Sequence, residues 1–395
     1  MLNANNTHLS PAPDGNQVLC WSGEAGASVW DLSTDPPHMS ANLPQLAVIA
    51  ADWNSSGTKI AIASTVGGNE NKAIEFRIWD PTQPQADAVP MQRSYQLHAG
   101  DLFTRFMDEG SKLVVRAPAG PAVVEVAKGE EIFRLDLTPQ SSFTQYCSAV
   151  SNRLVAACER MTSPHVENRL RAWDSSGRLK FETQLPSARR VFSLHFSPDA
   201  RLLAVIGEFG VRLWRSRDSA WEPVPLPKAD QHIAFIDFDR AGSHLAYLDD
   251  SSMCHVVRLA ESNLSTTSFY VPGMPIQTSF SPDGKRLALL TNRNGVSIWD
   301  WSRGEPLTQN YRPDNALRQS LFAPDGNHLI LAGRNGGLEW LTIPTADDVP
   351  WTELTRQVQR ITGSTWSADK SKRRLTAKEW KQLAGASAAE GSAEP

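Results

Sequence analysis

The stretch FSPDGKRLALLTNRNGVSIWD, residues 280–300, contains the pattern that decides the fold. Its Pro-Asp-Gly segment ends at Gly284, where proline presets φ and glycine accepts the positive φ of a tight turn. Residues 285–292 then place apolar side chains on both faces of an extended segment, which indicates a strand covered on both sides. An Asn-Gly pair ending at Gly295 favours a two-residue hairpin turn. The stretch therefore predicts three consecutive antiparallel strands that lead toward a fourth.

The turn glycine of this pattern recurs along the chain with a period of 42 residues. Well-preserved copies have it at Gly15, Gly57, Gly242, Gly284 and Gly326. Weaker copies lie around Gly110, Ser151-Asn152 and Asp199-Ala200. The sequence thus contains eight copies of one supersecondary unit, and such a unit buries its apolar faces only by stacking on its neighbours.

A tryptophan marks the third strand of most copies. Trp30 and Trp299 each follow the turn glycine by 15 residues. Four more occupy the matching strand: Trp79, Trp173, Trp214 and Trp340. We interpret them as packing residues whose indoles fill the space between stacked sheets, with the N–H near a carbonyl. Four-stranded units that stack into a ring leave only short, protected edges, so the sequence predicts a β-propeller.

Several strand ends resemble WD40 repeats. The matching segments are VWDL (29–32), RIWDP (77–81), RAWDS (171–175), RLWRS (212–216) and SIWDW (297–301), together with FSPD at 196–199 and 280–283. The resemblance covers roughly residues 7–343 and implies an all-β, WD40-like propeller. Two features of the family differ: no Gly-His pair precedes the first strand, and Asn294 or Asn335 stands where the family has an aspartate before the third strand. The family's buried hydrogen-bond network with the tryptophan is therefore not expected in its usual form.

Eight copies predict eight blades, with seven blades plus a divergent partial unit as the alternative. We expect the propeller over residues 1–344, a helix–short strands–helix extension over 345–385 and a disordered tail over 386–395. The last copy lacks a clear fourth strand. The strand that closes the ring is therefore expected from 1–8 or from 364–375.

The C-terminal extension follows a different pattern from the repeats. Residues 347–363 combine an acidic start, a proline in the first turn and a terminal glycine, which predicts a helix. A second helix is expected over 375–385, with Thr376 and Glu379 as its capping box. This tail resembles segments that follow WD40 arrays in large bacterial proteins, some of which carry a serine/threonine kinase domain. The resemblance suggests a stand-alone version or a fragment of such a protein.

Composition excludes several classes of function. A net charge of −4 over 395 residues provides no general attraction to nucleic acid or anionic membranes. No apolar run approaches the length of a membrane span, and the N-terminus lacks the features of a signal peptide. The four cysteines are widely spaced, which predicts reduced thiols and no zinc site: Cys20, Cys147, Cys158 and Cys254. We therefore expect a cytoplasmic protein without nucleic-acid or membrane partners, metal or cofactor.

Motifs that carry chemistry are absent from the sequence. It has no phosphate-binding loop, no kinase signature, no G-x-S-x-G elbow and no H-E-x-x-H. The histidines never occur in ligand spacing, and His195 and His244 are interpreted as structural residues. The adjacent carboxylates of Asp249 and Asp250 are interpreted as solvated loop groups. The sequence predicts no enzyme, although ligands gathered at the propeller axis would escape detection by spacing.

Surface loops remain as the candidate site, because binding residues concentrate on loops held by rigid scaffolds. Aromatic and arginine side chains dominate protein hot spots. The partner-binding candidates in the loops between second and third strands are Met161, His165, Phe209, Arg293 and Arg334. We expect a non-enzymatic scaffold that binds a protein or peptide, as a monomer or within a hetero-complex. The alternatives are a regulatory or sensor segment associated with a serine/threonine kinase, and a propeller enzyme with an axial site.

Overall fold

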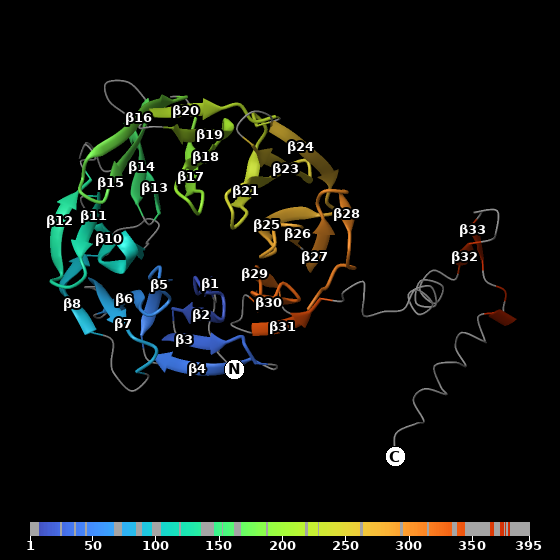
Figure 1. Cartoon of the computed structure of the whole chain (residues 1–395), viewed down its shortest axis with the longest axis horizontal. Coiled ribbons are helices and arrows are strands. Elements are labelled where there is room, and N and C mark those ends of the chain that lie inside the picture. The colour runs from blue at the N-terminus through green and yellow to red at the C-terminus, as the bar shows by residue number, and fades with distance from the viewer. Residues whose placement is uncertain are drawn as a thin grey trace, which may run out of the picture. The chain divides into compact units, whose positions relative to one another are not determined.

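The computed structural model describes two compact units, residues 1–342 and 343–395. Description covers residues 8–343 except 24–25, 35–36, 44–45, 67–72, 84–88, 97–103, 118–119, 136–145, 152, 162–166, 187–188, 218–219, 228, 261–263, 293–294, 314–315 and 334–337. It also covers 364–366, 372–374, 376 and 378–379. In these residues the first unit is a ring of eight antiparallel sheets around a central axis (Figure 1). The eight-bladed propeller predicted from the repeat is confirmed.

Strands follow the chain order within each blade, and the first strand is the innermost (Figure 1). Blade one contains β1 (His8–Pro11), β2 (Gln17–Ser22), β3 (Gly26–Asp31) and β4 (His38–Leu43). Blade two contains β5 (Ala47–Trp53), β6 (Ile60–Val66), β7 (Ala73–Trp79) and β8 (Val89–Gln96). Blade three contains β9 (Thr104–Met107), the 3-10 turn η1 (Asp108–Gly110), β10 (Lys112–Ala117), β11 (Gly120–Glu125) and β12 (Glu130–Arg134). Blade four contains β13 (Tyr146–Val150), β14 (Leu154–Met161), β15 (Glu167–Asp174) and β16 (Leu179–Leu185).

The second half of the ring repeats this arrangement. Blade five contains β17 (Val191–Phe196), β18 (Leu202–Gly207), β19 (Gly210–Arg217) and β20 (Ala220–Val224). Blade six contains β21 (Ile233–Phe238), β22 (His244–Asp249), β23 (Met253–Leu259) and β24 (Leu264–Tyr270). Blade seven contains β25 (Met274–Phe280), β26 (Arg286–Asn292), β27 (Gly295–Asp300) and β28 (Glu305–Pro306). Blade eight contains β29 (Leu317–Phe322), β30 (His328–Gly333) and β31 (Leu338–Thr342).

The turn glycines adopt the conformation that their sequence predicts. Gly284 has φ 70°, in the turn that joins β25 to β26. Gly15 has φ 81°, and a Cβ there would lie 2.9 Å from the Cγ of Pro324 in blade eight. A side chain at this position would therefore be strained twice, by the backbone and by the neighbouring blade.

Apolar residues from both faces of each sheet pack against the neighbouring blades. Trp79 is fully buried, and Trp299 stacks on Phe269 of blade six with ring centroids 5.0 Å apart. This confirms the packing role predicted for the tryptophans. The indole N–H of Trp299 donates to the Oγ of Ser297 at 2.9 Å, so a serine hydroxyl replaces the carbonyl that was expected.

Side chains of the innermost strands join several neighbouring blades. Gln277 of β25 accepts the backbone N–H of Ser320 at 2.8 Å. Gln319 of β29 makes two such bonds across the seam of the ring: its Oε1 accepts from the Leu9 N–H at 3.0 Å, and its Nε2 donates to the Leu9 carbonyl at 3.1 Å. Gln319 thus connects the first and last blades at the inner rim.

An apolar cluster covers the same seam. It combines blade one with blade eight and contains Leu9, Val18, Cys20, Ile330 and Ala332. The described part of blade eight has three strands, and the closing strand predicted from 1–8 or 364–375 is not assigned there. That strand stays a prediction, because residues 1–7 lie outside the described range.

The second unit is described only in part. β32 (Ser364–Trp366) pairs with β33 (Lys372–Arg374) in an antiparallel hairpin. The predicted capping box is present: the Thr376 N–H donates to Glu379 Oε2 at 2.7 Å, and the Glu379 N–H donates to Thr376 Oγ1 at 3.3 Å. The helix expected over 347–363 and the tail expected over 386–395 lie outside the described residues. Within the described residues, no helix is long and apolar enough to cross a membrane.

Candidate functional site

Two of the five loop residues predicted from the sequence, Met161 and Phe209, lie within the described part of the chain. Met161 is the last residue of β14, and His165, Arg293 and Arg334 lie outside the described residues. Phe209 is 7% exposed, and its ring lies over Gly207, where a Cβ would be 2.5 Å from the ring. Little of the Phe209 ring is left for a partner to contact. The binding role of these residues stays a prediction.

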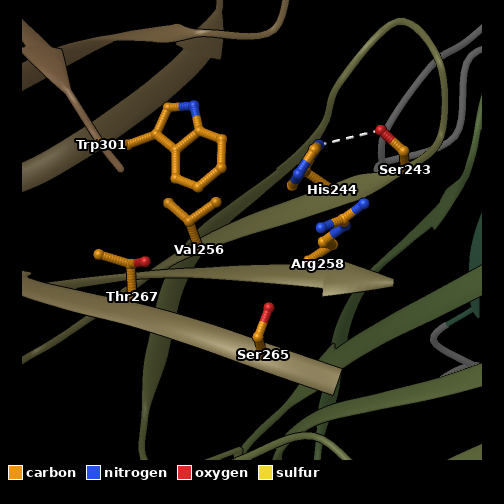
Figure 2. Close-up of a pocket in the computed structure, with 7 residues that line it drawn as sticks. All are labelled: Ser243, His244, Val256, Arg258, Ser265, Thr267 and Trp301. Carbon is orange, nitrogen blue, oxygen red and sulfur yellow. Dashed lines mark hydrogen bonds between the residues drawn. The ribbon is translucent and has the colours of Figure 1, made fainter. Parts of the chain in front are cut away.

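A groove between blades six and seven is the candidate site. Its volume is about 300 Å³. Figure 2 shows the residues that line it: Ser243, His244, Val256, Arg258, Ser265, Thr267 and Trp301. Six of them belong to blade six, and Trp301 belongs to the turn that follows β27 of blade seven.

The strand register of blade six builds the floor of the groove. His244 lies opposite Arg258 on the next strand, and Arg258 lies opposite Ser265 on the outermost one. Val256 and Thr267 form the adjacent cross-strand pair. Residues opposite one another, and residues two apart on a strand, share a face of the sheet. This face is turned toward blade seven, because Val256 belongs to the apolar cluster that joins the two blades.

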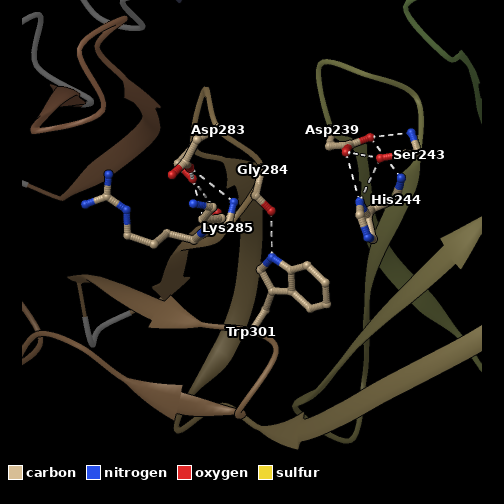
Figure 3. Close-up of polar contacts among 9 residues, drawn as sticks. Asp239, Ser243, His244, Asp283, Gly284, Lys285 and Trp301 are labelled. Atoms are coloured by element: carbon tan, nitrogen blue, oxygen red, sulfur yellow. Dashed lines mark hydrogen bonds and ion pairs between the residues drawn. The ribbon is translucent and has the colours of Figure 1, made fainter.

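Trp301 forms the opposite wall. Its indole N–H donates to the Gly284 carbonyl at 2.8 Å, which fixes the ring above the sheet of blade six (Figure 3). The centroids of the Trp301 and His244 rings are 4.9 Å apart. The turn containing Trp301 can approach blade six closely because Gly304 lacks a side chain; a Cβ there would lie 3.0 Å from the Cβ of Phe269. The groove therefore has a rigid aromatic wall.

A polar network holds His244 in place. Its Nδ1 lies 2.9 Å from Oδ2 of Asp239, and the Ser243 hydroxyl donates to the same carboxylate at 2.7 Å (Figure 3). Burial acts to raise the pKa of Asp239, but hydrogen bonds from His244 and Ser243 outweigh it, so this pKa lies below its ordinary value. An ionised carboxylate only accepts hydrogen bonds. The proton therefore resides on Nδ1 of His244, and the ring orientation is fixed.

Arg258 is the unusual residue of the groove. It is exposed, and it makes no hydrogen bond or ion pair with any described residue. Arg215 occupies the equivalent position in blade five, and its guanidinium donates to the Leu259 carbonyl of the next blade at 2.6 Å. Arg215 also lies opposite the acidic Glu222, whereas Arg258 lies opposite Ser265. Among the described residues, the Arg258 guanidinium of blade six therefore lacks a hydrogen bond to the next blade such as Arg215 makes in blade five.

Sequence reasoning missed this groove. Its arginine lies on a strand, outside the loops that contain the predicted binding residues, and the sequence predicts only a structural role for His244. One signal was present in the motif itself: SIWDW has a second tryptophan, Trp301, one residue after the expected ending. The cross-strand pairing of Arg258 with Ser265 becomes visible only once the register is known.

Asp249 corrects a second interpretation made from the sequence. Its side chain is buried rather than solvated, and its Oδ2 lies 3.1 Å from Nε2 of the buried His255. The other ring nitrogen of His255 lies 2.8 Å from the Ser268 hydroxyl. A buried aspartate–histidine network therefore exists in blade six, although its histidine comes from the third strand and not from a Gly-His pair.

Titratable side chains near the axis connect blades. Asp52 and Arg105 form an ion pair at 2.6 Å between blades two and three. Burial, with a smaller effect from the Arg105 charge, lowers the pKa of His195 to about 4. Burial raises the pKa of Asp237 to about 7, although its carboxyl accepts the Phe280 N–H at 3.1 Å. Within the described residues, no three His, Cys, Asp or Glu side chains are placed to hold a metal.

The fold of the described residues is an eight-bladed β-propeller of the WD40 type. A solved structure of the C-terminal WD40 domain of Sif2 is similar, with a TM-score of 0.63 and 14% sequence identity. The match covers 87% of this chain and 97% of that domain. No protein-family model and no curated protein matches the sequence. At this identity the similarity shows the fold alone.

Proposed function

We propose that this protein is a non-enzymatic, cytoplasmic interaction scaffold that binds an acidic segment of a protein partner in the groove between blades six and seven. The observation that carries the proposal is the guanidinium of Arg258, which faces the fixed ring of Trp301 across the groove and has no acidic partner among the described residues. An arginine and a tryptophan are the side chains most enriched in binding hot spots.

The groove suits recognition better than catalysis. Its shape is preformed by strand register and by the hydrogen bond that holds Trp301, so little ordering cost falls on the propeller when a partner binds. Its lining contains one arginine, one histidine and three hydroxyl groups. The Ser243 hydroxyl already donates to Asp239, so it is not a nucleophile activated by His244.

A random peptide library displayed on phage tests the proposal. We expect peptides selected on the wild-type propeller to bind the Arg258→Glu variant at least about tenfold more weakly, which corresponds to about 1.4 kcal/mol. The matched control is Arg201→Glu, since the Arg201 side chain is 79% exposed on the turn between β17 and β18 of blade five. Selected peptides that bind the Arg258→Glu and Arg201→Glu variants equally well would contradict the proposal.

The same selection tests the loop surface predicted from the sequence. The double variant Arg293→Glu, Arg334→Glu reverses two charges in the loops between second and third strands. Peptides that lose affinity for this variant and keep it for Arg258→Glu would assign binding to the loops. The groove proposal requires the opposite pattern.

A further inference from the structure

We infer that the groove recognises a phosphomonoester, carried by a phosphorylated serine or threonine of the partner segment. This inference rests on the proposed function and specifies the ligand of the same groove. It follows from the charge balance of the groove, from the number of free donors on its floor, and from a comparison with blade five.

The acidic residues that border the groove are already engaged. Asp239 accepts hydrogen bonds from Ser243 and from the backbone N–H groups of Ser243 and His244. Asp300, next to Trp301, accepts from the Ser302 hydroxyl at 2.7 Å and from two backbone N–H groups of its turn. Among the described residues, neither these carboxylates nor any other acidic group forms an ion pair with Arg258, so within this part of the chain its positive charge is left for a ligand.

The floor of the groove has more hydrogen-bond donors than are needed to satisfy the two oxygens of one carboxylate. A guanidinium has five N–H donors, and two parallel ones already satisfy both oxygens of a carboxylate. Ser265 lies beside Arg258 on the outer strand, and Thr267 follows on the same face. Neither hydroxyl makes a hydrogen bond to a described residue. A phosphate has three terminal oxygens and nearly two negative charges at neutral pH, and it can engage the guanidinium and both hydroxyls together.

Blade five has an acidic residue at the equivalent position of its outermost strand, where it forms an ion pair with Arg217. There Glu222 lies opposite Arg215, where blade six has Ser265 opposite Arg258. The serine removes the intramolecular carboxylate and leaves its place open. Across the groove, Trp301 provides apolar surface for the residue next to the phosphorylated one.

Three small probes test the inference without knowledge of the partner: phenyl phosphate, phenylacetate and benzyl alcohol. Each combines an aromatic ring for Trp301 with a different polar group. Binding is followed by the NMR signal of the Trp301 indole N–H, assigned by its loss in Trp301→Phe. We expect phenyl phosphate to bind about tenfold more tightly than phenylacetate, and benzyl alcohol to bind most weakly.

Two variants identify the site. Arg258→Ala removes the guanidinium, and Ser265→Glu places a carboxylate opposite Arg258, at the position that Glu222 has in blade five, so both are expected to weaken phenyl phosphate binding at least about tenfold. Arg201→Ala is expected to change nothing. Because blade five accommodates Glu222 at the equivalent position, Ser265→Glu keeps the fold.

Each result has a distinct consequence. Phenylacetate binding as tightly as phenyl phosphate would overturn the phosphate inference and keep the acidic-segment proposal. If no probe shifts the Trp301 signal but library peptides still lose affinity for Arg258→Glu, the phosphate inference is overturned and the acidic-segment proposal is kept. Absence of both probe binding and Arg258-sensitive peptides would overturn both. Equal phenyl phosphate binding to wild type and Ser265→Glu would show that the anion binds elsewhere.

Discussion

Gln319 offers a direct test of how the ring is closed. In the described residues it makes the side-chain hydrogen bonds between the innermost strands of blades eight and one, one to the N–H and one to the carbonyl of Leu9. A typical intramolecular hydrogen bond contributes about 0.5–1.5 kcal/mol net. Gln319→Ala should therefore lower the free energy of unfolding by about 1–3 kcal/mol.

Gln277→Ala is the matched control. Gln277 makes one equivalent bond, to the Ser320 N–H, between blades that are adjacent in the chain. Its loss should cost about 0.5–1.5 kcal/mol. The apolar seam cluster remains intact in both variants, so both should fold. Urea unfolding gives the free energies, and hydrogen exchange over His8–Pro11 should accelerate in Gln319→Ala alone.

A third variant separates the two bonds of Gln319. Gln319→Glu keeps an acceptor for the Leu9 N–H but places a carboxylate against the Leu9 carbonyl. At neutral pH it should be less stable than Gln319→Ala, and it should recover below about pH 4, where a protonated carboxyl can donate. If Gln319→Ala and Gln277→Ala lose equal stability and the exchange of His8–Pro11 is unchanged, Gln319 does not close the ring.

Three further predictions concern burial and backbone conformation. The raised pKa of Asp237, about 7, means that its contribution to stability is present below pH 4 and is lost as the pH rises to about 7. Asp237→Asn should therefore be more stable than wild type at pH 8 and approach it at pH 4 in urea unfolding. The buried hydroxyl of Tyr247 donates to a backbone carbonyl, so Tyr247→Phe should lower the unfolding free energy by about 1–3 kcal/mol in the same assay. Gly284→Ala should cost about 1–2 kcal/mol from positive φ alone. In Gly295→Ala the new Cβ would also overlap the Tyr311 carbonyl, so its thermal midpoint should fall further.

The repeat made the fold predictable because each feature of the unit has a local physical cause. Turn glycines, apolar runs on both strand faces and the tryptophan stripe all indicate stacked sheets, and the eight sheets follow. The closure of the ring was not predictable in this way. Gln319 and Leu9 are 310 residues apart, and no local pattern relates a glutamine side chain to a strand at the other end of the chain.

The groove escaped prediction for a related reason. The sequence-based prediction places binding residues on loops and packing residues on strands. Phe209 does not follow this rule, because it lies on a loop and its ring is buried in the core. Arg258 lies on a strand, and its meaning depends on Ser265 across the sheet and on Trp301 from the next blade. Register and blade order must both be known before these three residues can be placed together.

Comparison of equivalent positions therefore carries more information about function than any single motif. Arg215 and Arg258 occupy the same place in adjacent blades. Arg215 donates to a carbonyl of the next blade and lies opposite Glu222, whereas among the described residues Arg258 makes no such bond and lies opposite Ser265. Packing constrains both positions alike, so packing alone does not explain why the residue opposite the arginine is a glutamate in blade five and a serine in blade six. In a repeat protein, each position can be compared with the equivalent positions of the other repeats. In this propeller, blade six has Ser265 where blade five has Glu222, and the proposed anionic ligand would bind Arg258 in the groove that Trp301 also lines.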